Sequence, residues 1–210
     1  MSSSRLPGEG IFIAVTGPSG SGKTSVCKAL LAMFPRLRFS VSLTTRPRRP
    51  AEVDGEDYHF VSEAEFRERI RRGDLIEWAE NYGHLYGTSR KAMEEALKGH
   101  DLLLDVDTRG ARALKKACPG GIFVFIVPPS IGELERRLRG RGSETEETIR
   151  RRFDNALREI REIVWYDYII VNDELDAAID RLRAVYLAAA CRRERMMEKI
   201  KPFFDRSGGM

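Results

Sequence analysis

The sequence contains few cysteines and histidines, and it has no long apolar run. Its three cysteines, Cys27, Cys118 and Cys191, are odd in number and far apart, which excludes a disulfide framework and a zinc-binding pattern. The three histidines also lack the spacing of metal ligands. No stretch reaches the roughly 20 apolar residues that span a bilayer, and the first residues lack the apolar segment of a secretion signal. We therefore expect a cytosolic protein without a membrane partner.

The excess of charge of either sign is small. The 210 residues include 36 Lys and Arg against 32 Asp and Glu, a formal net charge of +4. Such an excess is compatible with nucleic acid or with a small phosphorylated ligand, so the placement of the charges must decide. Hydrophobic residues make up 42% of the chain, which is enough for a buried core and excludes a wholly disordered protein.

Apolar, strand-like runs alternate with segments of helical periodicity along most of the chain. This alternation predicts βαβ units and a mostly parallel sheet. Between about residues 44 and 98 the rhythm changes, which indicates an inserted subdomain. The predicted strands are 11–15, 38–43, 58–61, 75–79, 102–107, 121–127 and 168–171. The predicted helices are 25–33, 63–72, 90–98, 109–117, 131–139, 146–163 and a long final helix over 175–200.

A glycine-rich motif lies between the first predicted strand and the first predicted helix. Its pattern is G-x-x-x-x-G-K-[ST], in which glycines let successive backbone N–H groups surround a phosphate. The helix N-terminus adds partial positive charge, Lys23 can reach the terminal phosphates, and Thr24 offers a hydroxyl to Mg²⁺. The motif predicts a nucleoside triphosphate site formed by Gly17, Pro18, Ser19, Gly20, Ser21, Gly22, Lys23 and Thr24.

Two further groups of residues have chemistry suited to phosphates. Arg46 and Arg49 lie three residues apart beside hydroxyl side chains, and such arginines can grip a phosphate with bidentate hydrogen bonds. Asp105 ends a predicted central strand, where open α/β sheets bind ligands. We assign Asp105, with Thr24, to Mg²⁺, partly through water, because this ion prefers oxygen ligands.

The chain resembles the guanylate kinases in an ordered set of motifs that runs from about Gly10 to the final helix. After the phosphate loop come S-x-x-x-R-x-x-R, G-x-D-Y-x-F, I-E-W, Y-G-T, D-x-D and G-R-G. The resemblance implies one α/β domain over residues 1–210, a P-loop fold of three α/β/α layers. Its core, built on a five-stranded parallel sheet, would comprise 10–43, 99–130 and 164–203, with an α+β GMP-binding insertion at 44–98 and a helical lid at 131–163. The implied reaction, in purine nucleotide metabolism, transfers the γ-phosphoryl of MgATP to GMP and yields ADP and GDP.

The resemblance also assigns roles to residues on the GMP side. Guanine presents N1–H and 2-amino donors, which need a carboxylate, and an O6 acceptor, which needs a donor such as a hydroxyl. Adenine would leave such groups unpaired, at a cost of ~1–3 kcal/mol each. By resemblance, the base would be read by Glu77, Thr88 and Asp107, and the GMP phosphate would be held by Ser42, Arg46, Arg49, Tyr58 and Tyr86.

On the ATP side, the resemblance implies a lid that closes over the phosphates. The matching segment of this chain, 133–161, is rich in arginine. Several of these arginines have glutamates at helical spacing and fit a solvated helix face. Asn172, after the last predicted strand, would approach the adenine, although an ordinary turn asparagine is an equal alternative. The arginines matched to the lid are Arg137, Arg141 and Arg152, and together with Lys23 and Arg46 they form the predicted catalytic set.

Three other functions remain open to test. The first is a non-catalytic interaction module of guanylate kinase type, which the intact Lys23 and Thr24 disfavour. The second is a kinase for a base-free acceptor such as a ribose phosphate, for which Glu77, Thr88 and Asp107 would be unnecessary. The third is a nucleic-acid binder, for which we find no reader motif. The partners we expect are ATP and GMP, without nucleic acid, and the oligomeric state is left open.

Overall fold

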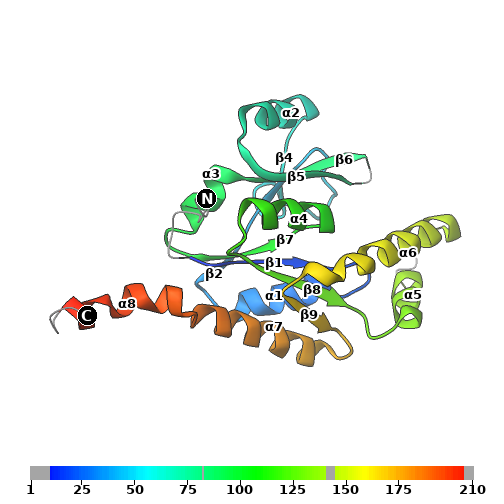
Figure 1. Ribbon diagram of the computed structural model, residues 1–210. Helices are drawn as coiled ribbons and strands as arrows, with labels where there is room; N and C mark the ends of the chain where they lie inside the picture. The colour runs from blue at the N-terminus through cyan, green and yellow to red at the C-terminus, as the bar shows by residue number, and fades with distance from the viewer. Residues whose placement is uncertain (1–9, 82, 141–144, 206–210) are drawn as a thin grey trace.

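The computed structural model of the protein describes residues 10–81, 83–140 and 145–205. Its centre is a five-stranded, fully parallel sheet in the order β2-β7-β1-β8-β9 (Figure 1). The five-stranded parallel core sheet is therefore confirmed. The strands are β1 (Phe12–Thr16), β2 (Leu37–Phe39), β7 (Asp101–Asp105), β8 (Ile122–Val127) and β9 (Tyr168–Val171).

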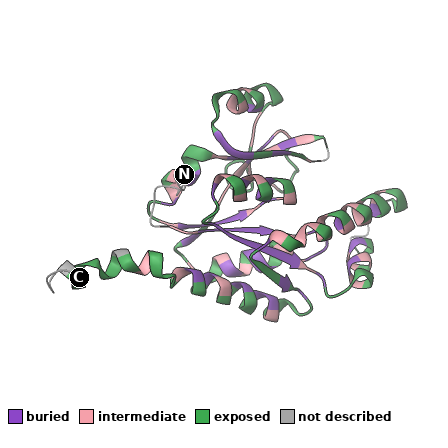
Figure 2. Ribbon diagram, in the orientation of Figure 1, coloured by how far each residue is buried: buried purple, intermediate pink, exposed green. Residues whose placement is uncertain are grey.

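Helices cover both faces of this sheet. The side chains of Ile13 and Val15 pack with α1 (Lys23–Met33) and α7 (Leu175–Ala190), whereas those of Phe12 and Ala14 pack with α3 (Arg90–Ala96) and α4 (Thr108–Ala117). Because both faces are buried, β8 is apolar along its whole length and β1 is apolar except for the buried Thr16 (Figure 2). The result is the three-layer arrangement expected from the sequence.

A second, four-stranded sheet lies on the side of the core that carries α4 and is drawn at the top of Figure 1. Its order is β4-β3-β6-β5, and α2 packs Phe66 against Leu43, Leu75 and Leu85 of the sheet. These elements are β3 (Ser42–Thr44), β4 (Tyr58–Phe60), α2 (Glu63–Arg72), β5 (Leu75–Asn81) and β6 (His84–Ser89).

The prediction of a single strand over 38–43 is wrong, because the chain passes from the core sheet to the second sheet within these residues. The Ser40 N–H still bonds to the Leu103 carbonyl of β7, at 2.9 Å, but two residues later Ser42 pairs with Tyr58 in the second sheet. Strand β6 was not predicted, since it is short of β-branched apolar residues and contains Gly87.

Two helices form the segment that the sequence assigns to a lid. They are α5 (Ile131–Arg139) and α6 (Glu146–Arg161), which is followed by the short 3₁₀ helix η1 (Glu162–Trp165). Leu134 and Leu138 of α5 pack with Ile149 and Ala156 of α6 in a small core of their own. Arg141, one of the predicted lid arginines, lies outside the described residues.

The prediction of one continuous final helix over 175–200 is also wrong. This part of the chain forms two helices, α7 and α8 (Arg193–Asp205), separated at Cys191 and Arg192. Helix α7 packs on the core, whereas α8 extends away from it (Figure 1). The buried Asp101 of β7 holds this corner, because it accepts a hydrogen bond from the Tyr186 hydroxyl at 2.8 Å and pairs with Arg195 at 2.9 Å. Within the described part of the chain, no helix is long and apolar enough to cross a membrane.

Candidate active site

The phosphate loop connects β1 to α1 at the carboxyl edge of the core sheet. Gly20 and Gly22 have φ values of +88° and +83°, a left-handed conformation that favours glycine. Among the described residues, no side chain caps the N-terminus of α1, and the first turn contains no acidic residue. Its N–H groups and its partial positive charge therefore face the loop, as an anion site requires.

Asn172 lies directly behind this loop, at the end of β9. It is buried, and its amide Nδ2 donates a hydrogen bond to the Ser21 carbonyl at 2.7 Å. A Cβ at Gly22 would lie only 2.2 Å from the same Nδ2, so this glycine is required for the close approach. The described contacts of Asn172 thus join it to the phosphate loop; its predicted approach to adenine stays a prediction.

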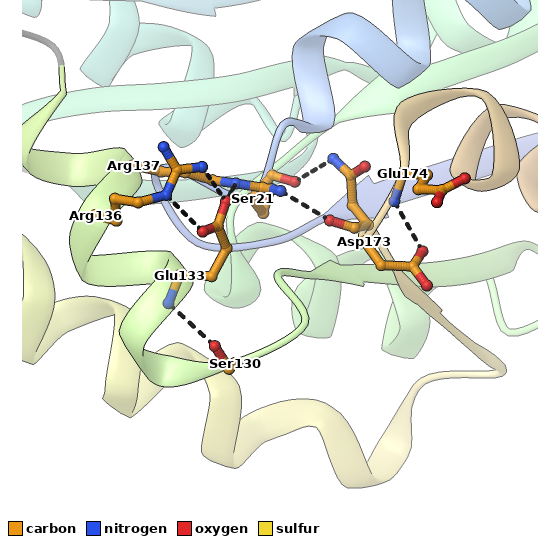
Figure 3. A network of polar contacts seen from close by, with 8 residues as sticks. Ser21, Ser130, Glu133, Arg136, Arg137, Asp173 and Glu174 are labelled. Carbon is orange, nitrogen blue, oxygen red and sulfur yellow. Dashed lines mark hydrogen bonds and ion pairs between the residues drawn. The ribbon is translucent and has the colours of Figure 1, made fainter.

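The backbone of Asn172 also contacts α5, the first helix of the predicted lid. Arg137 donates from Nη2 to the Asn172 carbonyl at 3.1 Å, and its Nε pairs with Glu133 at 2.6 Å (Figure 3). Glu133 also accepts from Arg136, and these two guanidinium groups lower the pKa of Glu133 to about 2. A chain of polar contacts therefore runs from α5 through the end of β9 to the phosphate loop.

Lys23 and Asp105 form an ion pair beside the loop. Burial opposes the charge of Lys23, but the adjacent Asp105 carboxylate outweighs this effect and raises the lysine pKa. Thr24 is exposed in the first turn of α1. A hydroxyl and one carboxylate are the hard oxygen donors that suit Mg²⁺ bound chiefly through substrate phosphates. In the described ranges of the chain, no group of three or more His, Cys, Asp or Glu side chains could hold a metal ion.

Arg46 lies in the bend after β3 and is held by a residue that was not predicted from the sequence. Glu52 accepts from Arg46 Nη2 at 2.6 Å with one oxygen and from the backbone N–H of Arg49 at 2.9 Å with the other. The hydrogen bond from Arg46 lowers the pKa of Glu52. The Arg46 guanidinium also lies over the rings of Tyr58 and Phe60, 5.5 and 5.8 Å from their centres. An acidic residue six positions after an arginine has no distinguishing pattern in the sequence.

The other residues predicted for the GMP phosphate come from neighbouring strands. Ser42 of β3 pairs in register with Tyr58 of β4, and the rings of Tyr58 and Tyr86 are 6.0 Å apart. Arg49 lies on the connecting loop with its side chain exposed. The fold thus gathers two tyrosines, a serine hydroxyl and the Arg46 guanidinium at one sheet, although 44 positions separate Ser42 from Tyr86 in the sequence.

The three residues predicted to read guanine occupy adjoining positions. Glu77 and Thr88 are cross-strand partners in β5 and β6, both buried, and the Thr88 hydroxyl donates to Glu77 Oε1 at 2.6 Å. Asp107 caps α4 by accepting from the Gly110 N–H at 2.8 Å. Burial raises the pKa of Glu77 to about 7; the Thr88 hydrogen bond opposes this shift, and the negative charge of Asp107 adds to it.

A cleft of about 510 Å³ opens beside Asp107, between the end of β5, α4 and α6. Glu159 of α6, which was not predicted from the sequence, lines this cleft. Burial raises the pKa of Glu159 to about 7; the charge of Lys23 opposes this shift, and the charge of Asp107 adds to it. The lining includes Asn81, Asp107, Arg112, Asn155, Arg158 and Glu159.

The remaining lid arginines differ in their surroundings. Arg139 pairs with Glu135 and Glu146, at 3.0 and 2.6 Å, which agrees with the solvated helix face expected from the spacing. Arg152 lies half-buried on α6. Of the predicted phosphate-contacting arginines, Arg137 contacts the Asn172 carbonyl next to the loop. Phosphate contact by Arg137 and by Arg152 stays a prediction.

Known proteins are similar to this chain in sequence and in fold. A sequence model of the guanylate kinase family matches residues 11–189. The guanylate kinase of Syntrophotalea carbinolica is 50% identical over 197 residues, which cover 93% of this chain and 94% of its own. That of Geobacter metallireducens is 49% identical over 198 residues, with 94% and 98% covered.

A solved structure agrees with these relatives. The crystal structure of guanylate kinase from Anaplasma phagocytophilum is 32% identical, with a TM-score of 0.75, and the match covers 94% of this chain and 96% of that chain. The family match and the near end-to-end identity of about one half lead to one conclusion: the chain belongs to the guanylate kinase family.

Proposed function

We propose that this protein transfers the γ-phosphoryl group of MgATP to GMP and releases ADP and GDP. The observation that carries the proposal is the hydrogen-bonded pair of Glu77 and Thr88, buried beside Asp107 at the same edge of the fold as the phosphate loop. A carboxylate matches the N1–H and 2-amino donors of guanine. The Thr88 hydroxyl has one proton, which it donates to Glu77 in this structure, so it would donate to O6 only by releasing Glu77 when guanine binds. A base-free acceptor would not require a buried carboxylate and hydroxyl at this place, where the two groups already bond to each other.

On the acceptor side, Arg46 supplies the guanidinium for the GMP phosphate. Glu52, Tyr58 and Phe60 fix its position before substrate arrives, which reduces the ordering cost of binding. Ser42, Arg49, Tyr58 and Tyr86 complete the phosphate site with hydroxyl and guanidinium donors. The acceptor phosphate is already anionic, so its attack on ATP requires no protein base.

On the donor side, the loop Gly17–Thr24 holds the ATP phosphates through its N–H groups, with Lys23 as a cation beside them. Thr24 and Asp105 would hold Mg²⁺, which supplies neutralisation of phosphate charge when bound. Arg137, Arg141 and Arg152 would add positive charge from the lid and exclude water, because water would otherwise compete with GMP. Catalysis then consists of positioning and electrostatic stabilisation.

We also propose a cytosolic location, which the free thiols of Cys27, Cys118 and Cys191 support. The three cysteines would persist unpaired in a reducing compartment, and two of them are buried in the core.

Coupled steady-state kinetics with ATP and each of GMP, AMP, CMP and UMP tests the proposed activity. We expect kcat/KM for GMP to exceed that for AMP by about 100-fold or more, since adenine mismatches at least two buried groups at ~1–3 kcal/mol each. Equal or faster turnover of AMP would contradict the guanine assignment, and absence of ATP turnover with every acceptor would contradict the kinase function.

A further inference from the structure

We propose that Gly110 is a specificity-determining residue for the base of the acceptor nucleotide. This inference rests on the proposed function, because it concerns the carboxylate assigned to guanine. Gly110 lies in the first turn of α4 and is itself buried. A Cβ built on it would lie 2.7 Å from Oε2 of Glu77 and 3.4 Å from Oδ1 of Asp107. The missing side chain therefore provides the space that the Glu77 carboxylate fills.

Backbone geometry does not account for this glycine. Gly110 lies inside a regular helix, where alanine is the better helix former. Its N–H donates to Asp107 Oδ1, a bond that any residue except proline could make. The feature that sets Gly110 apart is the close approach of a side chain from the other sheet.

Glu77 cannot retreat from a methyl group and keep its present contacts. Its backbone is held in β5 by pairing with β6, and its Oε1 accepts the 2.6 Å hydrogen bond from Thr88. The clashing atom is nevertheless the end of a side chain, so rotation of the carboxylate can relieve the contact. We therefore expect a substituted protein to fold but to misplace the acceptor for guanine N1–H and the 2-amino group.

The test compares Gly110→Ala with Gly132→Ala. Gly132 lies in the first turn of α5, and the nearest atom to its Cβ is Ser130 Oγ at 4.0 Å, so this substitution changes helix propensity without a clash. We expect Gly110→Ala to lower kcat/KM for GMP by about tenfold or more, the loss of ~1.4 kcal/mol of base recognition. The KM for ATP should stay unchanged. The preference for GMP over IMP, which lacks the 2-amino group, should shrink.

Gly132→Ala should preserve both the GMP kinetics and the preference for GMP over IMP. A folded Gly110→Ala protein with unchanged GMP kinetics and preference would overturn the inference. If Gly110→Ala does not fold, the double variant Glu77→Ala/Gly110→Ala decides, because it removes the clashing carboxylate. We then expect the double variant to fold with the residual GMP activity of Glu77→Ala, and its failure to fold would also overturn the inference. Failure of the proposed function is distinguishable, since the unsubstituted protein would then not phosphorylate GMP.

Discussion

At the scale of single residues, Glu52 determines where the Arg46 guanidinium lies. One carboxylate oxygen holds that guanidinium and the other holds the backbone of Arg49, so a single side chain orders both arginines of the motif. Arg46 has several rotatable bonds, and without this contact it would sample other positions. We infer that Glu52 is a positioning residue for the acceptor phosphate site.

We predict that Glu52→Ala raises the KM for GMP by about tenfold, equivalent to ~1.4 kcal/mol, with little change in the KM for ATP. The reason is the loss of preorganised charge at the acceptor site. Steady-state kinetics with each substrate varied in turn measures the two effects. Glu56→Ala is the matched control, since Glu56 is an exposed acid of the same loop. Equal effects of the two substitutions would contradict the positioning role.

At the scale of elements, the end of β9 connects the lid to the phosphate loop. The Asn172 side chain holds the Ser21 carbonyl, while its backbone carbonyl accepts from Arg137 of α5 (Figure 3). The first contact depends on the amide and the second does not. A substitution at this position therefore separates loop anchoring from lid contact.

We predict that Asn172→Ala raises the KM for ATP by about tenfold, because the phosphate loop loses a buried hydrogen bond worth ~1 kcal/mol or more. Asn172→Asp should be more harmful, since a carboxylate would face the Ser21 carbonyl without a proton to donate. The KM for GMP should change little in both variants. Glu174→Ala, at an exposed position two residues later, serves as the control. Identical kinetics of Asn172→Asp and the unsubstituted protein would refute the anchoring role.

At the scale of the whole molecule, the core could be predicted and the junctions could not. Strands buried on both faces give continuous apolar runs such as Ile122–Val127, which have few other interpretations. The change of sheets after Ser40 and the break at Cys191 lack glycine or proline, so the local pattern continues through them. Tertiary contacts decide both places.

The candidate site divides in the same way. The phosphate loop and its Lys23 could be predicted from local sequence, because their chemistry depends on consecutive residues. Glu52, Glu159 and Gly110 could not, since their importance arises from contacts with residues distant in the chain or without a characteristic spacing.

We propose that the buried Glu77 carboxylate selects guanine. Its pKa is raised to about 7, so the residue becomes protonated as the pH falls below that value and then loses capacity to accept both guanine donors. Glu77→Gln is neutral at every pH. The phosphate of GMP titrates near pH 6 in either protein, and comparison of the two therefore isolates the carboxylate.

The most direct measurement is the pH profile of kcat/KM for GMP, from pH 5.5 to 8.5 (about three units around the pKa), for the unsubstituted protein and Glu77→Gln. We predict that above pH 7 the variant is lower by about 10- to 100-fold, the value of one or two charge-assisted hydrogen bonds. The difference in kcat/KM for GMP between the two proteins should decrease as the pH falls, while the KM for ATP stays the same. Coincident profiles for the two proteins would show that the Glu77 carboxylate does not select guanine.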